Sequence, residues 1–217
     1  MNLNLNLGQW IVIGLSAVMV IWYIGANSAN RNLGMSIYRW LVSSLEPIGK
    51  ISSVEWFDSP GSGGKLVVSQ PMRSFRKVEI IYLLERREFL PYWIVSHLQG
   101  KRDEVRILMD LRIAPKSHLE VVPGSPLGSI QPTQDDLHSP SKHQTAHAGF
   151  AINYEDNESD RLLERLKVFL DAYEQTVVRI RLQPKNPHLV IIARVKPLLR
   201  IEPKSYLSSV RDWFQES

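Results

Sequence analysis

The chain has 217 residues, of which 44% are hydrophobic and 22% are charged, with a net charge of +4 and no cysteine. This composition is typical of a folded chain long enough for one medium or two small domains, and it excludes a disordered protein. The absence of thiols excludes disulfide bonds, cysteine nucleophiles and cysteine-ligated metal sites.

The most apolar segment lies at the start of the chain, where no charged residue occurs from Leu7 to Ala26. A helix rising 1.5 Å per residue crosses a hydrocarbon core of about 30 Å with about 20 residues, so this segment predicts one transmembrane helix. Aromatic rings at both ends, on Trp10, Trp22 and Tyr23, favour the two headgroup levels. The predicted anchor covers 1–30, and its characteristic side chains are Trp10, Ile13, Leu15, Val18, Val20, Trp22 and Tyr23.

Two other interpretations compete for this segment. A cleaved signal peptide would carry Lys or Arg before the apolar run, where none stands, although the small residues Ala26, Ser28 and Ala29 offer a cleavage site. A buried core helix is disfavoured because no polar face interrupts the run. Basic residues follow the run at Arg31 and Arg39 and none precedes it, so the remainder of the chain is predicted to be cytoplasmic.

The predicted first half, 31–122, begins with an amphipathic helix over 30–48 that either continues out of the membrane or lies on its surface. Runs rich in β-formers then predict strands, and a turn of Pro, Gly and Ser at 59–64 joins the first two. A helical pattern follows over 85–98, with Pro91 tolerated in its first turns. The predicted strands of this half cover 51–57, 65–70, 76–84, 103–113 and 119–122.

A stretch without periodicity, 123–148, is rich in Pro, Ser, Thr and Gln and predicts a flexible linker. The second half, 149–217, again alternates strands with helices. Its predicted strands cover 149–154, 176–182 and 187–195, and its predicted helices cover 161–173 and 203–214. This order predicts an α+β fold with a mainly antiparallel sheet, divided by the linker into two halves.

Two patterns resemble metal sites without meeting their requirements. The acidic segment 155–160 lacks the Gly and the bidentate Glu of a calcium-binding EF-hand loop, and capping of the following helix explains its carboxylates. The histidines His138, His143 and His147 lie in the polar linker, where a solvated loop is favoured over a metal site. We therefore predict no metal and no cofactor.

Two further patterns are weak signals of catalysis. His97 could act as a general base, but no nucleophile or acidic pair stands at a diagnostic spacing, and a hydrogen-bonded core histidine is the favoured interpretation. The glycine-rich segment 61–64 lacks the Lys-Ser or Lys-Thr of a phosphate-binding loop and predicts a hairpin turn. We therefore predict no catalytic residues.

Basic residues form the strongest remaining pattern. A domain beside an anionic membrane gains about 1 kcal/mol for each Lys or Arg near the surface. A ribosomal or other RNA backbone attracts the same charges without reading base sequence, so the sequence leaves both partners open and indicates no sequence-specific nucleic acid. The predicted contacts with an anionic surface are Arg73, Arg76, Lys77, Arg86, Arg87, Lys101, Arg102, Arg179 and Arg181.

After the apolar span and the amphipathic helix, the first half presents Gly64–Val68, Arg76–Arg87 and Lys101–Val105 in succession. The second half presents the helix 161–173, two strands and a final helix after Pro203. This order resembles the cytosolic domain of the calumin family of endoplasmic-reticulum proteins, although the sequence lacks that family's acidic lumenal region and basic coiled-coil tail. The resemblance implies a non-enzymatic role in assembling multipass membrane proteins beside the translocon and ribosome.

The patterns predict a single-pass membrane factor without catalytic function, and the resemblance implies that it assists membrane-protein biogenesis. Its expected partners are the lipid bilayer and nascent membrane proteins, the translocon or the ribosome. The helices over 35–45 and 89–98 are the candidate contact surfaces for apolar segments, although core packing is the favoured role of each individual residue in them. The alternative is a membrane-bound enzyme or ligand-binding domain, whose pocket lies between the two halves and uses His97 and the carboxylates of 155–160.

Overall fold

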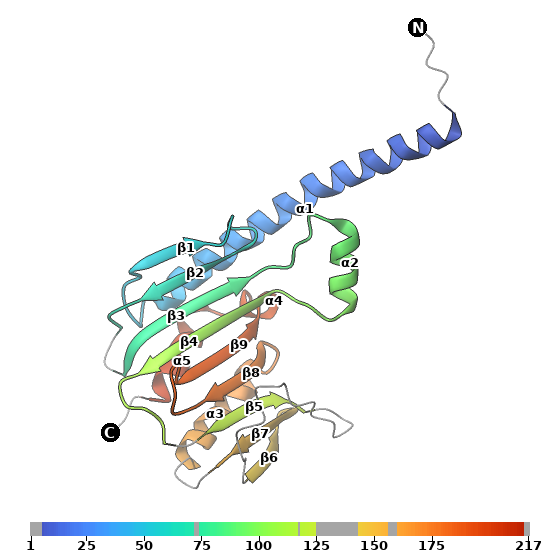
Figure 1. Cartoon of the computed structure of the whole chain (residues 1–217). Helices are drawn as coiled ribbons and strands as arrows, with labels where there is room; N and C mark the ends of the chain where they lie inside the picture. Colours follow the sequence, from blue (N-terminus) through green and yellow to red (C-terminus); the bar gives the residue numbers. More distant parts are fainter. Residues whose placement is uncertain (1–5, 72–73, 117, 125–142, 156–159, 215–217) are drawn as a thin grey trace.

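The computed structural model of the chain describes residues 6–71, 74–116, 118–124, 143–155 and 160–214. In this part of the chain one long helix projects from an antiparallel sheet of nine strands (Figure 1). Shorter helices lie behind the sheet and beside its edge. The predicted class, a long apolar N-terminal helix followed by an α+β domain with an antiparallel sheet, is confirmed.

The helix α1 (Leu7–Leu45) runs for 39 residues without a break, so of the two alternatives for 30–48 the structure has the one in which the amphipathic helix continues the apolar one. Its start is capped by Asn6, whose side-chain oxygen accepts a hydrogen bond of 2.9 Å from the Gln9 backbone N–H. The first half stands away from the sheet, whereas the second half packs behind it (Figure 1). The residues of α1 that are buried are Asn30, Gly34, Ile37, Trp40, Leu41, Ser44 and Leu45.

The strands form one sheet in the order β1-β2-β3-β4-β9-β8-β5-β7-β6, and every neighbouring pair is antiparallel. In that order they are β1 (Ser53–Trp56), β2 (Gly63–Val68), β3 (Phe75–Leu83), β4 (Glu104–Leu111), β9 (Leu189–Arg194), β8 (Val177–Leu182), β5 (Leu119–Pro123), β7 (Phe150–Tyr154) and β6 (His143–His147). At the centre, β4 pairs with β9, with Ile107 opposite Ile191. The two halves of the sequence therefore contribute to one sheet.

The predicted linker 123–148 is wrong at its C-terminal end, because His143–His147 forms the edge strand β6. This strand joins β7 through Ala148 and Gly149, whose φ angles are 49° and 76°. Positive φ at both central positions is typical of two-residue hairpin turns, since it matches the twist of the strands. Ala146 is the one apolar residue of this strand, which therefore has no apolar alternation, and this is why the pattern missed it. Residues 125–142 of the predicted linker lie outside the described residues.

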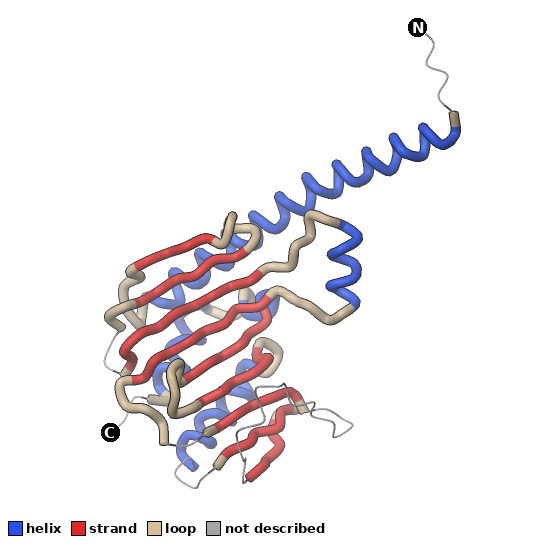
Figure 2. Tube along the Cα trace, in the orientation of Figure 1, coloured by secondary structure: helices blue, strands red, loops and turns tan. Residues whose placement is uncertain are grey.

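Helices cover one face of the sheet (Figure 2). They are the second half of α1, α3 (Asp160–Tyr173) and α5 (Pro203–Asp212). A single turn, α4 (Val195–Leu198), follows β9 directly and leads the chain behind the sheet. The predicted helices 161–173 and 203–214 are thereby confirmed to within two residues at each end.

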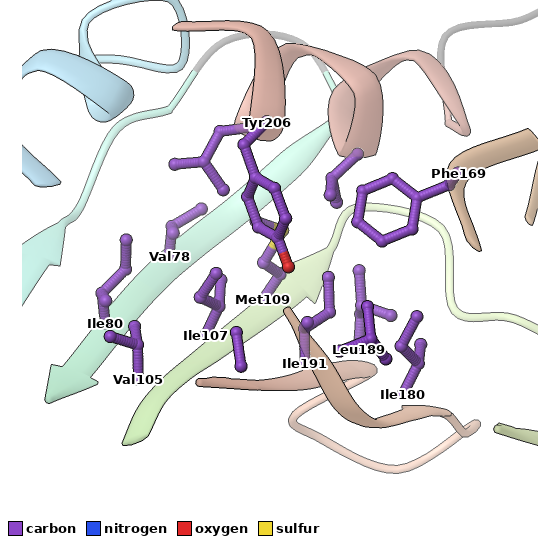
Figure 3. Packing of buried hydrophobic residues seen from close by; sticks show 14 of the residues in the cluster. Val78, Ile80, Val105, Ile107, Met109, Phe169, Ile180, Leu189, Ile191 and Tyr206 are labelled. Atoms are coloured by element: carbon purple, nitrogen blue, oxygen red, sulfur yellow. The ribbon is translucent and has the colours of Figure 1, made fainter. Parts of the chain in front are cut away.

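The core lies between the sheet and these helices. Ile107 and Ile191 point from the sheet toward Phe169 of α3 and Tyr206 of α5 (Figure 3), and all four are buried. Trp40 of α1 closes the core at its edge, where its indole N–H donates a 2.9 Å hydrogen bond to the Ile201 carbonyl. Apolar burial of this kind contributes about 25 cal/mol per Å² removed from water. The second half of α1 is therefore an integral part of the domain.

The opposite face of the sheet points away from the helices (Figure 2). Along β4 the residues Val105, Ile107 and Met109 are buried, whereas Arg106 and Asp110 lie on the open face. This alternation follows from the two-residue period of a strand with one buried side. The same sequence pattern that predicted the strand thus also fixes which of its faces is charged.

Candidate membrane-surface site

The connection between β3 and β4 leaves the sheet and forms α2 (Leu90–Leu98) beside the projecting half of α1 (Figure 1). Pro91 lies in its first turn, as predicted, but the helix begins later than the predicted range 85–98. Among the residues of α2 only Ser96 is buried. The large apolar side chains exposed on and directly before α2 are Phe89, Tyr92, Ile94, Val95 and Leu98.

The structure separates the two candidate contact surfaces for apolar segments. In the segment 35–45, Ile37, Leu41 and Leu45 are buried against the sheet, so this segment belongs to the core, which is the role that the sequence favoured for its individual residues, and it is not a contact surface. The segment 89–98 is exposed instead. Helical periodicity marks an apolar face in both segments and does not tell which face has a partner within the domain.

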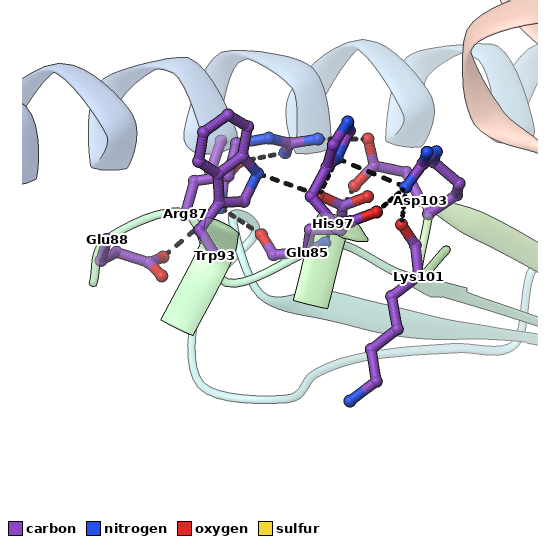
Figure 4. A network of polar contacts seen from close by, with 9 residues as sticks. Glu85, Arg87, Glu88, Trp93, His97, Lys101 and Asp103 are labelled. Atoms are coloured by element: carbon purple, nitrogen blue, oxygen red, sulfur yellow. Dashed lines mark hydrogen bonds and ion pairs between the residues drawn. The ribbon is translucent and has the colours of Figure 1, made fainter. Parts of the chain in front are cut away.

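A polar network joins α2 to α1 and to the start of β4 (Figure 4). The Arg87 guanidinium contacts the Asp103 carboxylate at 2.5 Å and donates to the Asn30 side-chain oxygen at 2.5 Å. The Asn30 amide donates to the Glu85 carbonyl at 2.8 Å, and the Glu85 backbone N–H donates to Asp103 at 2.9 Å. These bonds hold residues 85–89 in a non-helical path, which explains the late start of α2.

The side chains of this network are largely buried and connect α1, the loop before α2 and β4. The side chains of Asp103 and Arg87 are only 5% and 18% exposed, and Asn30 is fully buried. Charge-assisted hydrogen bonds of this kind are stronger than neutral ones, and each partner would be costly to leave unpaired. Arg87, predicted to contact an anionic surface, is thus committed to the domain itself.

Two tryptophans bring α2 and α1 into direct contact. The Trp22 and Trp93 ring centroids lie 5.4 Å apart, and the Trp22 indole N–H donates a 2.7 Å hydrogen bond to the Arg87 carbonyl. The Trp93 indole N–H donates to a Glu85 carboxylate oxygen at 3.0 Å. Trp22, predicted from the sequence to mark a headgroup level, is therefore the residue where α2 meets α1.

His97 lies at the surface, so its predicted place in the core is wrong. Its side chain is 47% exposed, its Nδ1 lies 3.5 Å from a Glu85 carboxylate oxygen, and its ring is 5.3 Å from that of Trp93. The pattern could not reveal this, because α2 packs against α1 and the loop with only part of its circumference.

Three of the predicted basic contacts flank α2. Arg86 precedes the helix, Lys101 and Arg102 follow it, and all three are exposed. The Lys101 ammonium lies 5.8 Å from the centre of the Tyr92 ring. One Arg102 guanidinium nitrogen donates to the His97 carbonyl at 2.9 Å, where it satisfies the C-terminal turn of α2. The apolar side chains of α2 are thus bordered by positive charge.

The remaining predicted basic contacts lie elsewhere. Arg179 and Arg181 share the open face of β8, as the strand period predicts, and both contact the Glu120 carboxylate of β5. Arg76 is exposed at the start of β3, the end of the strand that is away from α2, and Arg73 lies outside the described residues. The structure therefore distributes the predicted basic residues over separate places and does not bring them onto one surface.

A cavity of about 200 Å³ opens on the charged face of the sheet. The Lys77 ammonium and the Glu79 carboxylate form an ion pair there, and Lys65 contacts the same carboxylate at 3.3 Å. The hydrogen bond from Lys77 lowers the pKa of Glu79, and the same bond raises the pKa of Lys77. The residues that line the cavity are Lys77, Glu79, Leu108, Asp110, Asn186 and Pro187.

The residues of the predicted alternative site are not brought together. His97 lies beside the start of β4, whereas Glu155 follows β7, which is four strands away in the sheet, and neither lines this cavity. Glu155 instead accepts a hydrogen bond of 3.4 Å from the His118 backbone N–H. Residues 156–159 lie outside the described residues.

The linker histidines also differ from the prediction. His147 contacts the Asp171 carboxylate of α3 at 2.8 Å, and the His143 ring lies 5.4 Å from that of Tyr154, so neither is part of a solvated loop. His138 lies outside the described residues. Within the described ranges, no three His, Asp or Glu side chains are grouped as a metal site would require.

Sequence reasoning missed the network that joins α1, α2 and β4. Its partners are far apart in the chain, since Arg87 and Asn30 are 57 positions apart. The available signals were single polar residues at unusual places: Asn30 directly after an apolar run and Asp103 at the entrance of a strand. An isolated polar residue of this kind indicates that a hydrogen-bond partner exists, but the sequence does not show which residue that partner is.

No protein-family model matches the chain, and no curated protein matches it either. The resemblance to the calumin family therefore stays a prediction.

Proposed function

We propose that the protein is a single-pass membrane factor without catalytic function, whose helix α1 crosses the bilayer and whose sheet domain lies on the cytoplasmic side. The observation that carries the proposal is the continuity of α1. Its first part is long and apolar enough to cross a membrane and is exposed, and the same helix then enters the core. A bilayer would remove those apolar side chains from water, and the helix satisfies its own backbone groups in lipid.

Basic residues support the cytoplasmic placement of the domain. Arg31, Arg39 and Lys50 follow the apolar part of α1, and no Lys or Arg precedes it in the sequence. Cytoplasmic flanks of membrane spans carry an excess of such residues. This asymmetry favours the orientation in which the first residues lie outside and the sheet inside.

We assign this factor to membrane-protein biogenesis, with nascent membrane proteins, the translocon or the ribosome as partners. Two features support the assignment. The network around Asn30, Arg87 and Asp103 would hold the domain at a fixed height and rotation above the bilayer. The order of elements resembles that of the calumin domain, which implies the same setting.

Co-sedimentation of the full chain with ribosomes, after detergent solubilisation, tests this role. We expect the protein to pellet with ribosomes at low salt and to stay in the supernatant at high salt, because contacts with a phosphate backbone weaken as salt rises. The same preparation without ribosomes is the control for aggregation. A protein that stays in the supernatant at every salt concentration contradicts direct ribosome binding.

The cavity on the open face supports a second candidate function, the binding of a small polar ligand. It lies between β3 and β4 of the first half and the β8–β9 turn of the second, and two carboxylates and an ammonium face it. A thermal-shift screen of the full chain with divalent metals and nucleotides tests this candidate. A ligand at 100 times its Kd stabilises by about 2.7 kcal/mol, and Glu79→Gln should reduce that shift. A screen without any shift contradicts it.

A further inference from the structure

We propose that α2 is a second membrane contact, lying in the plane of the bilayer surface that α1 enters, with its exposed apolar side chains among the lipids. This inference rests on the proposed anchoring of α1 and goes beyond it, because it assigns lipid binding to a segment of the domain. The occupant is a bilayer that contains anionic lipid.

The helix α2 exposes an apolar surface. Leu98 is 81% exposed, Phe89 58% and Val95 52%, and all three lie within ten residues of one another. Soluble proteins rarely expose contiguous apolar surface of more than a few hundred Å², and such patches mark interaction sites. A short helix with apolar and aromatic side chains outward is typical of segments that lie in a membrane interface.

The position of α2 along α1 also favours a membrane contact. Trp22 and Trp93 join the two helices, and α2 runs across the direction of α1 rather than along it (Figure 1). From Leu7 to Trp22 the helix rises about 24 Å, which approaches the thickness of a hydrocarbon core. With α1 near the membrane normal, α2 therefore lies near the bilayer plane, at the level where tryptophan rings settle.

Positive charge surrounds the apolar side chains of α2. Arg86, Lys101 and Arg102 are exposed and flank the apolar side chains of α2. Basic residues near a membrane surface gain about 1 kcal/mol each from anionic lipid. The combination of apolar side chains, a positive border and continuity with an apolar span favours lipid over a second copy of the chain or another protein.

The polar network makes this contact rigid. Arg87, Asp103 and Asn30 hold the loop before α2 against both α1 and β4 (Figure 4). A helix held in this way cannot turn its apolar side chains away from the bilayer without breaking buried ion pairs. Together, α1 and α2 would define the orientation of the sheet relative to the membrane, which a single helix leaves free to rotate.

The absence of cysteine permits a site-specific test in the full chain. Leu98→Cys carries an environment-sensitive nitrobenzoxadiazole label, and the protein is reconstituted into phosphatidylcholine vesicles containing phosphatidylglycerol. Val168→Cys is the matched control, because Val168 is a 69% exposed aliphatic residue on α3, a helix behind the sheet. Val18→Cys reports on the anchor itself.

We expect the label at position 98 to emit at shorter wavelength than the label at 168. Lipids with a nitroxide near the headgroup should quench most of its fluorescence, whereas iodide in the water should quench only the label at 168. If the labels at 98 and 168 behave alike while the label at 18 is quenched by lipid, the inference is wrong and the anchoring stands. A label at 98 shielded from both quenchers indicates a protein partner and also overturns it. If lipid nitroxides do not reach position 18, the anchoring fails, and this inference fails with it.

Discussion

The two halves of α1 share one backbone conformation and have opposite surroundings. Over residues 7–29 no residue is buried, whereas over 30–45 seven residues are buried against the domain. The first half is uncharged and mostly apolar, with apolar residues on every side, whereas the second has apolar residues on one stripe, including Leu33, Ile37 and Leu41. The distribution of side chains around a helix, and not its propensity to be helical, thus determines which environment each part requires.

Asn30 marks the boundary between the two halves. It is fully buried, and both functional ends of its amide are used, one by the Glu85 carbonyl and the other by the Arg87 guanidinium. A side chain with this demand has no partner in hydrocarbon. Asn30 therefore lies where the exposed apolar half of α1 ends and the buried half begins.

The largest effect on this boundary is expected from Arg87→Ala. The substitution leaves the Asp103 carboxylate buried without its cation, and such a loss costs about 3–5 kcal/mol. Urea unfolding of the full chain in detergent, followed by near-UV circular dichroism, measures the change in the free energy of unfolding. Arg86→Ala removes an exposed charge next to it and is expected to change that energy by less than about 0.5 kcal/mol. Equal free energies of unfolding for the two variants would show that the network does not hold α1, the loop before α2 and β4 together.

Each half of α1 contains a glycine whose substitution by Ala tests how closely that half is packed. A Cβ on Gly34 would lie 1.8 Å from the Pro60 carbonyl oxygen, whereas a Cβ on Gly25 would meet no atom within 4 Å. Gly34→Ala is therefore expected to lower the free energy of unfolding by about 2–3 kcal/mol, because α1 must move away from the β1–β2 turn. Gly25→Ala should leave it unchanged or raise it slightly, since Ala favours helix. The same denaturation experiment decides, and a destabilising Gly25→Ala would contradict the exposed state of the first half.

Trp40 and Trp10, one in each half of α1, are expected to differ less in their effect on stability. Trp40→Phe removes the indole N–H that bonds to the Ile201 carbonyl and is expected to cost about 1–2 kcal/mol. Trp10→Phe alters an exposed ring in the first half and should leave the unfolding of the domain unchanged. Differential scanning calorimetry of the two variants measures the difference, and an equal decrease in Tm for both would remove the distinction between the halves.

The smallest effect is expected away from α1, at the ion pair of the open face. Glu79→Gln should cost about 0.5–1 kcal/mol at neutral pH. Because Lys77 lowers the pKa of Glu79 below its ordinary value of 4.5, this contribution is present above that value and is lost as the pH falls through the lowered pKa. Unfolding of wild type and variant across pH 3–7 should therefore converge at the acidic end. A constant difference would show that the carboxylate does not depend on its ammonium partners.

The elements that the sequence predicted well are those whose burial has a clear period. The alternation of Val105, Ile107 and Met109 predicted β4 and its buried face, and the apolar stripe of 30–48 predicted the second half of α1. In both cases the sheet and the helices bury one side of the element and leave the other open. Burial then leaves a periodic trace in the residue order.

The parts that the sequence did not predict depend on contacts without such a trace. The strand His143–His147 is a polar edge strand, placed by the Ala148-Gly149 turn and not by an apolar face. The start of α2 depends on Asp103, which comes later in the chain and accepts a hydrogen bond from the Glu85 backbone N–H in the loop before α2. The exposed state of α2 depends on where α1 lies. Each is a consequence of pairing across the fold, which a single sequence does not encode as a local pattern.

The most direct test of the account is the sidedness of the two halves of the chain in intact cells. A membrane-impermeant maleimide is applied to variants with one cysteine, Val18→Cys in the apolar half of α1 and Val168→Cys in the sheet domain. We predict that position 168 is unreactive in intact cells and reacts once the membrane is opened. Position 18 is expected to stay unreactive in intact cells and in opened membranes, and to react only after detergent has removed the lipid. Labelling of position 168 from outside intact cells, or labelling of position 18 in an intact bilayer, would contradict the account.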